Sequence, residues 1–299
     1  MLRGAFLPEG RQMRLNKLMV GTSVVFLTVA LTACNITINP VSTGALETYK
    51  VNIARPTDLS QAWSVELDVG SAGTNVGVGA DGLVSGTIEY NVSDWKPLVI
   101  NSDHAVQIRQ KDFNGIPPLN AQNDWHLRLG AGVPMALTVR GGAMKGEWEL
   151  GGLSLTRFDW QQGAADTTVR FSTPNPASME KFKLDAGAST LKVLGIANTH
   201  VQSATINIAA GSLILRLDGK LTRDMVLSLE GGAAAVTIDS GSNPVQVITG
   251  QSLTAVTRGN WSTDGGDTYM SPEWTKESSP KITVQARMGA STLNLVSGQ

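Results

Sequence analysis

The apolar positions along the chain follow a period of two that returns at short intervals. In "LDAGASTLKV", residues 184–193, an apolar residue is followed three positions later by glycine, and then by two apolar residues at alternating positions. Related patterns occupy residues 139–148, 160–169, 208–217, 229–238 and 286–295. Alternation of this kind is typical of strands that bury one face. The pattern therefore predicts a series of similar strands.

The spacing of these segments indicates how the strands are arranged. Their glycines lie at positions 142, 163, 187, 211, 232 and 289, so successive intervals are 21, 24, 24, 21 and 57 residues. Near-regular intervals with alternation predict a β-solenoid, in which each coil buries its apolar face only against its neighbours. The identical "GASTL" segments at 187–191 and 289–293 are then two rungs of one stack. An antiparallel β-sandwich with evenly spaced strands is the alternative.

Tryptophans fall into two groups in this register. Trp148 and Trp160 occupy inward positions and are expected in the core. The longest interval contains a turn-rich excursion at residues 259–280, which carries Trp261 and Trp274. These two rings are candidate contacts for a ligand or glycan, or they cover the open end of the stack.

The outward position two residues before each glycine is the place where a catalytic strip would lie. It holds an irregular mixture of residue types, namely Arg140, Gln161, Asp185, Ala209, Glu230 and Arg287. Many parallel β-helices cleave acidic polysaccharides with charged residues aligned on one strip. This column lacks a consistent charge and is expected to be solvated surface, so no catalytic residue is assigned.

Upstream of the rungs, residues 48–122 form a second β-rich segment with glycine-rich turns. Leu67, Gly70 and Val76 follow the same pattern faintly, and the break at 116–118 suggests a boundary. We expect an N-terminal β region at 48–122 and a β-solenoid domain at 123–299, which share one continuous core or form two.

The N-terminus has the features of an export signal. A basic stretch precedes an apolar run of residues 18–31, which is shorter than the roughly 20 residues that span a bilayer as a helix. The run ends in residues that resemble a bacterial lipobox, namely Leu31, Thr32, Ala33 and Cys34. The sequence predicts a signal peptide over 1–34, with translation starting at Met1 or Met13, lipidation of Cys34 and a flexible tether over 35–47. Acyl chains on Cys34 would hold the protein to the membrane from the extracytoplasmic side.

Composition narrows the function further. Formal net charge is −1, which gives no electrostatic basis for binding nucleic acid. "GVGADG" at residues 77–82 matches a dinucleotide fingerprint, but a strand-like segment follows it where the fingerprint requires a helix. The three histidines are isolated and there is one cysteine, so no metal site is assigned. We expect no cofactor and no nucleotide.

Two segments also resemble a known family. In "VELDVGSAGTNVGVGADGLVSGTIEYNVSDWKP", Tyr90, Asn91, Trp95 and Pro97 match its YN…W.P signature, and the ending "SPKITVQARMGASTLNL" matches as well. The chain resembles the toast-rack domains, which are related to LiaF-like cell-wall-active antibiotic response domains and to adhesin-like domains. The resemblance implies a right-handed single-coil β-helix outside the cytoplasm, and it implies no catalysis.

Together these features favour a non-catalytic, lipid-anchored extracytoplasmic protein that binds or scaffolds at the cell envelope, in envelope-stress response or adhesion. Its expected partners are the membrane, through Cys34, and an envelope protein or cell-wall glycan. Two alternatives stay open. One is a polysaccharide lyase or hydrolase built on a β-helix, and the other is a structural surface-layer protein that stacks through its ends.

Overall fold

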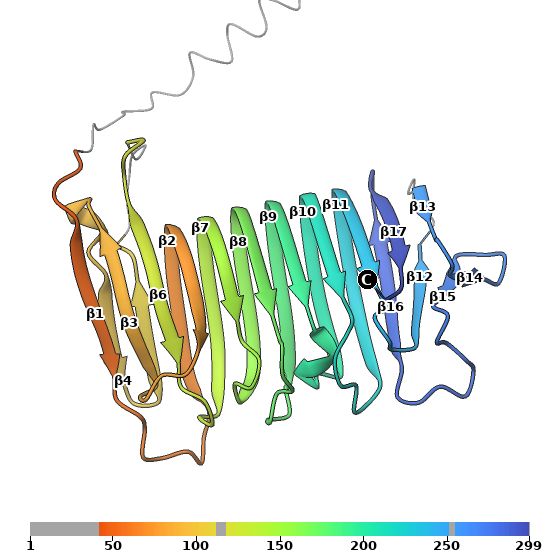
Figure 1. Ribbon diagram of the computed structural model, residues 1–299, viewed down its shortest axis with the longest axis horizontal. Coiled ribbons are helices and arrows are strands. Elements are labelled where there is room, and N and C mark those ends of the chain that lie inside the picture. The colour runs from red at the N-terminus through yellow and green to blue at the C-terminus, as the bar shows by residue number, and fades with distance from the viewer. Residues whose placement is uncertain (1–41, 112–117, 251–254, 299) are drawn as a thin grey trace, which may run out of the picture. The chain divides into compact units, whose positions relative to one another are not determined.

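A computed structural model of the protein describes residues 42–111, 118–250 and 255–298. This part of the chain forms a single open sheet of 17 strands with two short 3₁₀ helices (Figure 1). The predicted all-β, solenoid-like fold is confirmed.

Long parallel strands form the middle of the sheet, and each is one rung of the stack. In spatial order they are β2 (Trp63–Val78), β7 (Met135–Glu149), β8 (Leu155–Arg170), β9 (Lys181–Leu194), β10 (Ser203–Arg216) and β11 (Met225–Asp239). Five of the segments predicted from the glycine pattern are β7 to β11, and the sixth, residues 286–295, falls in the two final strands of the chain. Rungs β7 to β11 follow one another in space as they do in sequence.

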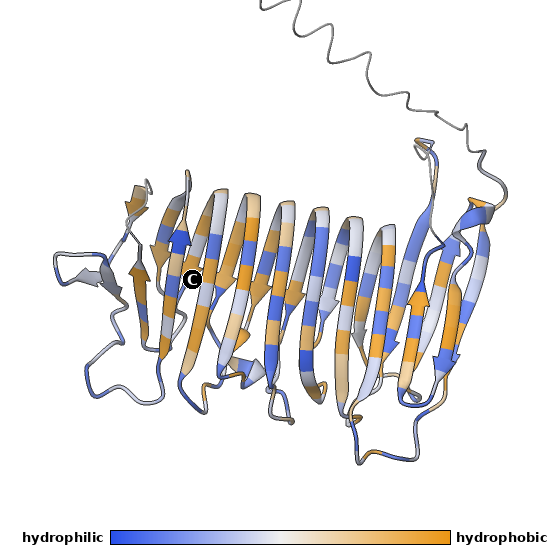
Figure 2. Cartoon of the chain, turned by 180° about the vertical axis from the view of Figure 1, so that it is seen from behind, coloured by the Kyte–Doolittle hydropathy of each residue, from blue (hydrophilic) through white to orange (hydrophobic). Residues whose placement is uncertain are grey.

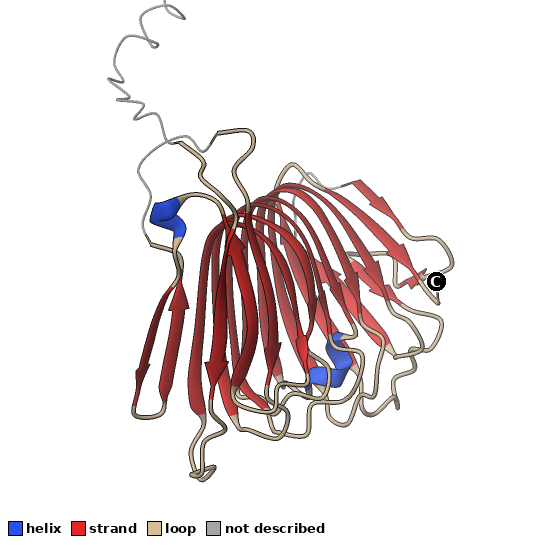
Figure 3. Cartoon of the chain, turned by 60° about the vertical axis from the view of Figure 1, so that its left-hand side comes forward, coloured by secondary structure: helices blue, strands red, loops and turns tan. Residues whose placement is uncertain are grey.

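Each rung arches over the loops that connect it to the next (Figure 3). In β9, Leu184 and Ala186 face the core before the bend, and Leu191 and Val193 face it after the bend. Bands of polar and apolar residues therefore alternate along the strands (Figure 2). At the bend the inward-facing positions change parity, in β9 from even to odd numbers.

A small residue, in most rungs glycine, is needed at the bend because neighbouring rungs approach closely there. A Cβ on Gly163 would lie 2.6 Å from the carbonyl oxygen of Gly142, and one on Gly187 would lie 2.8 Å from that of Gly163. The predicted position of Gly211 in this column is wrong. Ile208 pairs with Ala186 and Ala210 with Ala188, so Ala209 stands opposite Gly187. A slip of two residues keeps the same face inward, and the apolar pattern therefore does not reveal it.

The N-terminal β region continues the same sheet. On the side of β2 that faces away from β7, β5 (Ala105–Arg109) and β6 (Asn123–Leu129) pair with its two halves. Antiparallel strands extend both, namely β4 (Leu98–Ser102) beside β5, and β3 (Val84–Tyr90) and then β1 (Glu47–Ile53) beside β6, with 3₁₀ helix η1 (Ser93–Trp95) between β3 and β4. The sheet is therefore continuous across the boundary expected at residue 122.

At the other end, order in space departs from order in sequence. The final strands β16 (Ile282–Met288) and β17 (Thr292–Val296) lie between β11 and the earlier pair β12 (Val245–Thr249) and β13 (Ala255–Thr257). Beyond β12 lies the predicted excursion, with β15 (Thr268–Met270) and β14 (Ser262–Thr263). The second "GASTL" segment is thus a rung inserted between two others.

The core under the arch is apolar and partly aromatic. Trp148 and Trp160 are buried as predicted, with ring centroids 4.8 Å apart in an edge-to-face arrangement. Phe158 lies against Phe171 and Phe182 at 5.8 and 5.1 Å. Each ring of this size buries a large apolar area and so stabilises the packing of β7, β8 and β9.

Buried asparagines fix the loops on the inner side of the arch. Asn198, in 3₁₀ helix η2 (Ile196–Thr199), donates through Nδ2 to the carbonyl oxygen of Phe171 and accepts from the Lys220 amide, both at 2.8 Å. Asn175 and Asn243 make equivalent bonds to Leu155 and Leu217. Each asparagine ties one loop to a preceding rung, which satisfies backbone groups that the sheet leaves unpaired.

Candidate functional site

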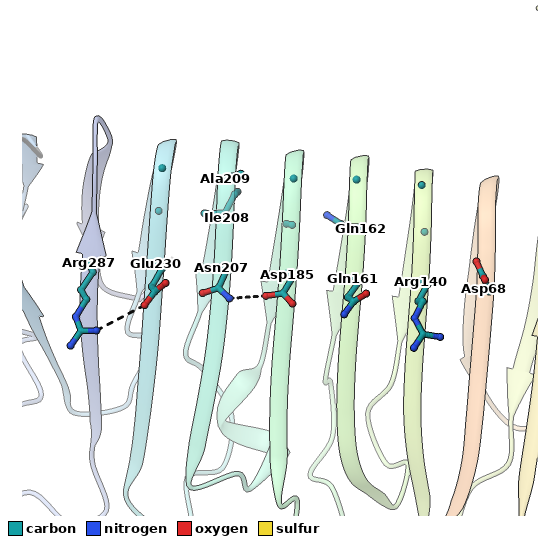
Figure 4. A pocket seen from close by; sticks show the side chains of 17 residues that line it. Asp68, Arg140, Gln161, Gln162, Asp185, Asn207, Ile208, Ala209, Glu230 and Arg287 are labelled. Carbon is teal, nitrogen blue, oxygen red and sulfur yellow. Dashed lines mark hydrogen bonds and ion pairs between the residues drawn. The ribbon is translucent and has the colours of Figure 1, made fainter. Parts of the chain in front are cut away.

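A shallow groove of about 900 Å³ runs across the outer face of the rungs beside the glycine bend (Figure 4). Its floor consists of small residues, because glycine or alanine occupies the bend in every rung from β7 to β11. At the bend these positions are Gly142, Gly163, Gly187, Ala209 and Gly232. Lacking long side chains, they leave a depression that crosses five neighbouring strands.

One wall of the groove is a column of polar side chains, one from each rung. Strand register aligns Asp68, Arg140, Gln161, Asp185, Asn207, Glu230 and Arg287. With rungs spaced by about 4.8 Å, these seven positions extend over roughly 29 Å. Every member ends in a planar carboxylate, carboxamide or guanidinium group.

The observed column differs from the expected one in β10, and it also includes Asp68 of β2. The sequence pattern placed Ala209 in it, whereas the structure places Asn207 there, because of the two-residue slip in β10. With Asn207 in place, the column is polar without interruption from β2 to β16. The acids Asp68, Asp185 and Glu230 are still separated by basic and amide side chains, so the column is not a row of aligned acids.

Neighbouring members of the column are linked to one another. Asn207 Nδ2 donates to Asp185 Oδ1 at 2.6 Å, and Arg287 Nη1 lies 4.0 Å from Glu230 Oε1. Just outside the column, Lys183 Nζ donates to Asp185 Oδ2 at 2.5 Å. Partial burial alone would raise the pKa of Asp185, but hydrogen bonds from Lys183 and Asn207 outweigh it, and the pKa lies below the usual 3.8. Asp185 is therefore an anion at neutral pH.

Two amide atoms of groove-lining residues have unmet hydrogen-bonding capacity. Within the described part of the chain, the buried atoms Asn207 Oδ1 and Gln162 Nε2 have no hydrogen-bond partner. The side chain of Gln162 is itself buried and accepts hydrogen bonds from Trp160 and Thr167 at 2.9 and 2.8 Å. Buried polar atoms of this kind are costly unless something satisfies them.

Among the functional residues predicted from the sequence, the lipobox Leu31–Cys34 lies outside the described residues. None of the helices in the described part of the chain is long and apolar enough to cross a membrane. Lipidation of Cys34 stays a prediction.

The two tryptophans of the excursion have different surroundings. Trp261 is buried, which favours the capping alternative for this ring. Trp274 is half-buried, and Lys281 Nζ lies 5.3 Å from its ring centroid in a cation–π arrangement. A glycan contact at this pair stays a prediction, and at Trp261 it would require the surrounding loop to open.

Among the described residues, the other motifs of the sequence belong to the fold and do not form a second site. "GVGADG" spans the end of β2 and the turn into β3, so a strand follows it and not a helix. His104 Nε2 lies 3.3 Å from Asp58 Oδ2. Across residues 42–111, 118–250 and 255–298, no three histidine, cysteine or acidic side chains group as metal ligands would.

The architecture is that of an open β-solenoid with a polar groove along its outer face. The sequence profile of the N-terminal domain of toast_rack, DUF2154, matches residues 42–194, slightly more than half of the chain. The chain belongs to this family, which confirms the resemblance seen in the sequence.

Several solved structures are similar to this chain. A candidate cell adhesion protein from Clostridium sporogenes is 16% identical over 85% of this chain and 99% of its own, with a TM-score of 0.46. A candidate adhesin from Bacteroides fragilis is 7% identical over 84% and 97%, with a TM-score of 0.35. A candidate lipid binding protein from Parabacteroides distasonis is 11% identical over 85% and 97%, with a TM-score of 0.27. No curated protein matches the chain.

Proposed function

We propose that this protein is a lipid-anchored extracytoplasmic binding protein of the cell envelope, and that the outer groove is its binding surface. The observation that carries the proposal is the uninterrupted polar column beside a floor of small residues. Sites that bind ligands are concave and combine an open surface with a few convergent polar groups. The lipobox-like residues at 31–34 support the location.

A binding role accounts for the groove better than catalysis does. Hydrolysis of a glycosidic bond generally uses two carboxyl groups, one of which must be a protonated acid with a raised pKa. In the groove, Asp185 has a lowered pKa, and amide or basic side chains separate the three acids. Membership of the toast-rack family supports an envelope context, of which stress response and adhesion are the two forms we consider.

The anchor is tested by removing its thiol. Replacing Cys34 with alanine should abolish incorporation of labelled palmitate and release the protein from the membrane fraction, because two or more acyl chains are needed for stable anchoring. Ser42→Ala, also in the N-terminal segment, is the control and should retain the label. Palmitate incorporation by the Cys34→Ala protein would contradict the assignment.

The groove is tested by filling it. Ala209 is exposed on the floor, and Ala209→Trp should place a ring in the groove without entering the core. Ala235→Trp is the matched control, because Ala235 is exposed on the same outer face but outside the groove. We expect crosslinking in cells, followed by mass spectrometry, to recover envelope material with the wild type and with Ala235→Trp. Unchanged recovery with Ala209→Trp would argue against the groove as the binding surface.

A further inference from the structure

We propose that the ligand of the groove is a linear, uncharged polysaccharide that lies along the axis of the stack, across the strands. This inference rests on the proposed function and gives its ligand a chemical class. Three features support it: the groove has no free strand edge, its wall carries charges of both signs, and its polar side chains recur once per rung.

The groove offers no free strand edge. Along it, each of the rungs β8, β9, β10 and β11 is paired with a neighbour on both sides. An extended peptide usually binds a sheet by adding a strand to an open edge, where backbone groups are unpaired. A chain that crosses paired rungs must be held by side chains instead, which disfavours a peptide.

The charges in the wall disfavour a charged polymer. Acids stand at three of the seven positions and oppose a polyanion, and Lys183 and Arg287 offset the charges of Asp185 and Glu230 only in part. Arg140 and Arg287 would repel a polycation at two others. Placing like charges together costs binding energy, and mixed columns therefore select against both.

A neutral polyhydroxylated chain fits the same wall. Carboxylates accept hydrogen bonds, guanidinium groups donate them and carboxamides do both, while a hydroxyl group donates and accepts. The small residues of the floor leave room for flat rings to lie close to the sheet.

The repeat of the wall favours a polymer over a small sugar. One planar polar side chain recurs per rung, at intervals of about 4.8 Å, along the whole groove. A ligand with a regular repeat can use several of these positions at once, and the separate contacts then reinforce one another. The central members, Asp185 and Asn207, are already held together by their hydrogen bond, so they are preorganised for such contacts.

The test is affinity electrophoresis of the detergent-extracted, full-length processed protein. Gels would contain one unbranched neutral polysaccharide each, namely a β-1,4-glucan, a β-1,3-glucan, an α-1,4-glucan or a mannan. Polygalacturonate and chitosan serve as the polyanion and the polycation. We expect retardation by at least one neutral polymer and none by the charged ones.

Variants then locate the site. The double variant Asp185→Ala/Asn207→Ala removes the centre of the wall. It should lower the affinity measured from the retardation about tenfold, because two hydrogen-bonding side chains are lost. Thr190→Ala/Ser212→Ala is the control, since these residues lie on the outer side of the same two strands, pair in register and lie outside the groove. It should stay within about twofold of the wild type. Thermal melts would verify that both proteins fold.

Three results would overturn the inference: no retardation by any neutral polymer, retardation by a charged polymer alone, or equal retardation of the wild type and the Asp185→Ala/Asn207→Ala protein. If neutral polymers fail but Ala209→Trp still removes an envelope protein from the crosslinked material, the proposed function holds and the polysaccharide assignment fails. If Ala209→Trp changes nothing in cells either, both fail.

Discussion

At the scale of single residues, two members of the family signature, Tyr90 and Asn91, form hydrogen bonds between strands and loops. Tyr90 is buried at the end of β3, and its hydroxyl donates to Glu47 Oε2 of β1 at 2.8 Å. The next residue, Asn91, donates to the carbonyl oxygen of Asn120 and accepts from the Gln122 amide. These side chains therefore fasten the outermost antiparallel strands to the rest of the sheet.

The environment of Tyr90 makes a prediction about alkaline pH. Burial, followed by the hydrogen bond and charge of Glu47, raises its pKa from 10.0 to about 12. The folded state thus favours the neutral phenol. Its stabilisation is fully present below pH 10 and is lost as the pH rises through about 12.

Substituting Tyr90 with phenylalanine tests this prediction. The variant should be less stable than the wild type by about 1 kcal/mol at neutral pH, because a hydrogen bond is lost. The difference should shrink above pH 10, as measured by urea unfolding at several pH values. Glu47→Gln should lower the pKa of Tyr90, seen in the ultraviolet absorbance of tyrosinate. A stability difference that is constant across the alkaline range would contradict the assignment.

At the scale of the strand, the bend depends on residues without a bulky side chain. Gly163→Ala would place a Cβ 2.6 Å from the carbonyl oxygen of Gly142, so the two rungs would have to separate. We expect a loss of about 1–3 kcal/mol in the free energy of unfolding, as is usual for overpacking. Gly250→Ala is the control, because an added Cβ there meets nothing within 4 Å. Equal stability of the two variants would show that the rungs separate at little cost.

The same strands show what the sequence could predict. Alternation identified the rungs and the inward positions of Trp148 and Trp160, because an apolar face must be buried whatever its neighbour is. Alternation does not fix the register, since a slip of two residues preserves the buried face, and it therefore predicts Gly211 at the bend where the structure has Ala209. Asn207 was missed in the candidate site for that reason. A comparison of neighbouring columns for continuous polarity would have favoured the observed register.

At the scale of the whole sheet, the strands at its two ends determine whether molecules can associate end to end. At one end of the parallel stack the antiparallel strands β1, β3 and β4 cover β5 and β6. At the other end β15 and β14 cover β12, while β13 pairs only with β17 among the described residues. A surface-layer protein that stacks end to end would present a flat, unpaired and apolar coil. Leu98 and Ile100 are exposed on β4, but they lie on a short antiparallel strand and not on such a coil. Covered ends are a usual way to prevent edge-to-edge association.

The inserted position of β16 and β17 makes a prediction that sequence order would not. Residues near a chain terminus usually fray and exchange their amide hydrogens quickly. Here β16 pairs with β11 on one side and β12 on the other, and β17 pairs with β11 and β13. Native-state hydrogen exchange should therefore find Ile282–Met288 and Thr292–Val296 protected to within about tenfold of β11.

The short strands of the excursion provide the comparison within the same molecule. Among the pairings described, β14 pairs only with β15, and both strands carry mostly exposed or half-buried residues. Their amides should exchange several orders of magnitude faster than those of β16, because they open without disturbing the stack. Exchange in β16 and β17 as fast as in β14 would mean that the last rung detaches on its own. The open edges of β11 and β12 would then be available to another chain, and the groove would lose its end at Arg287.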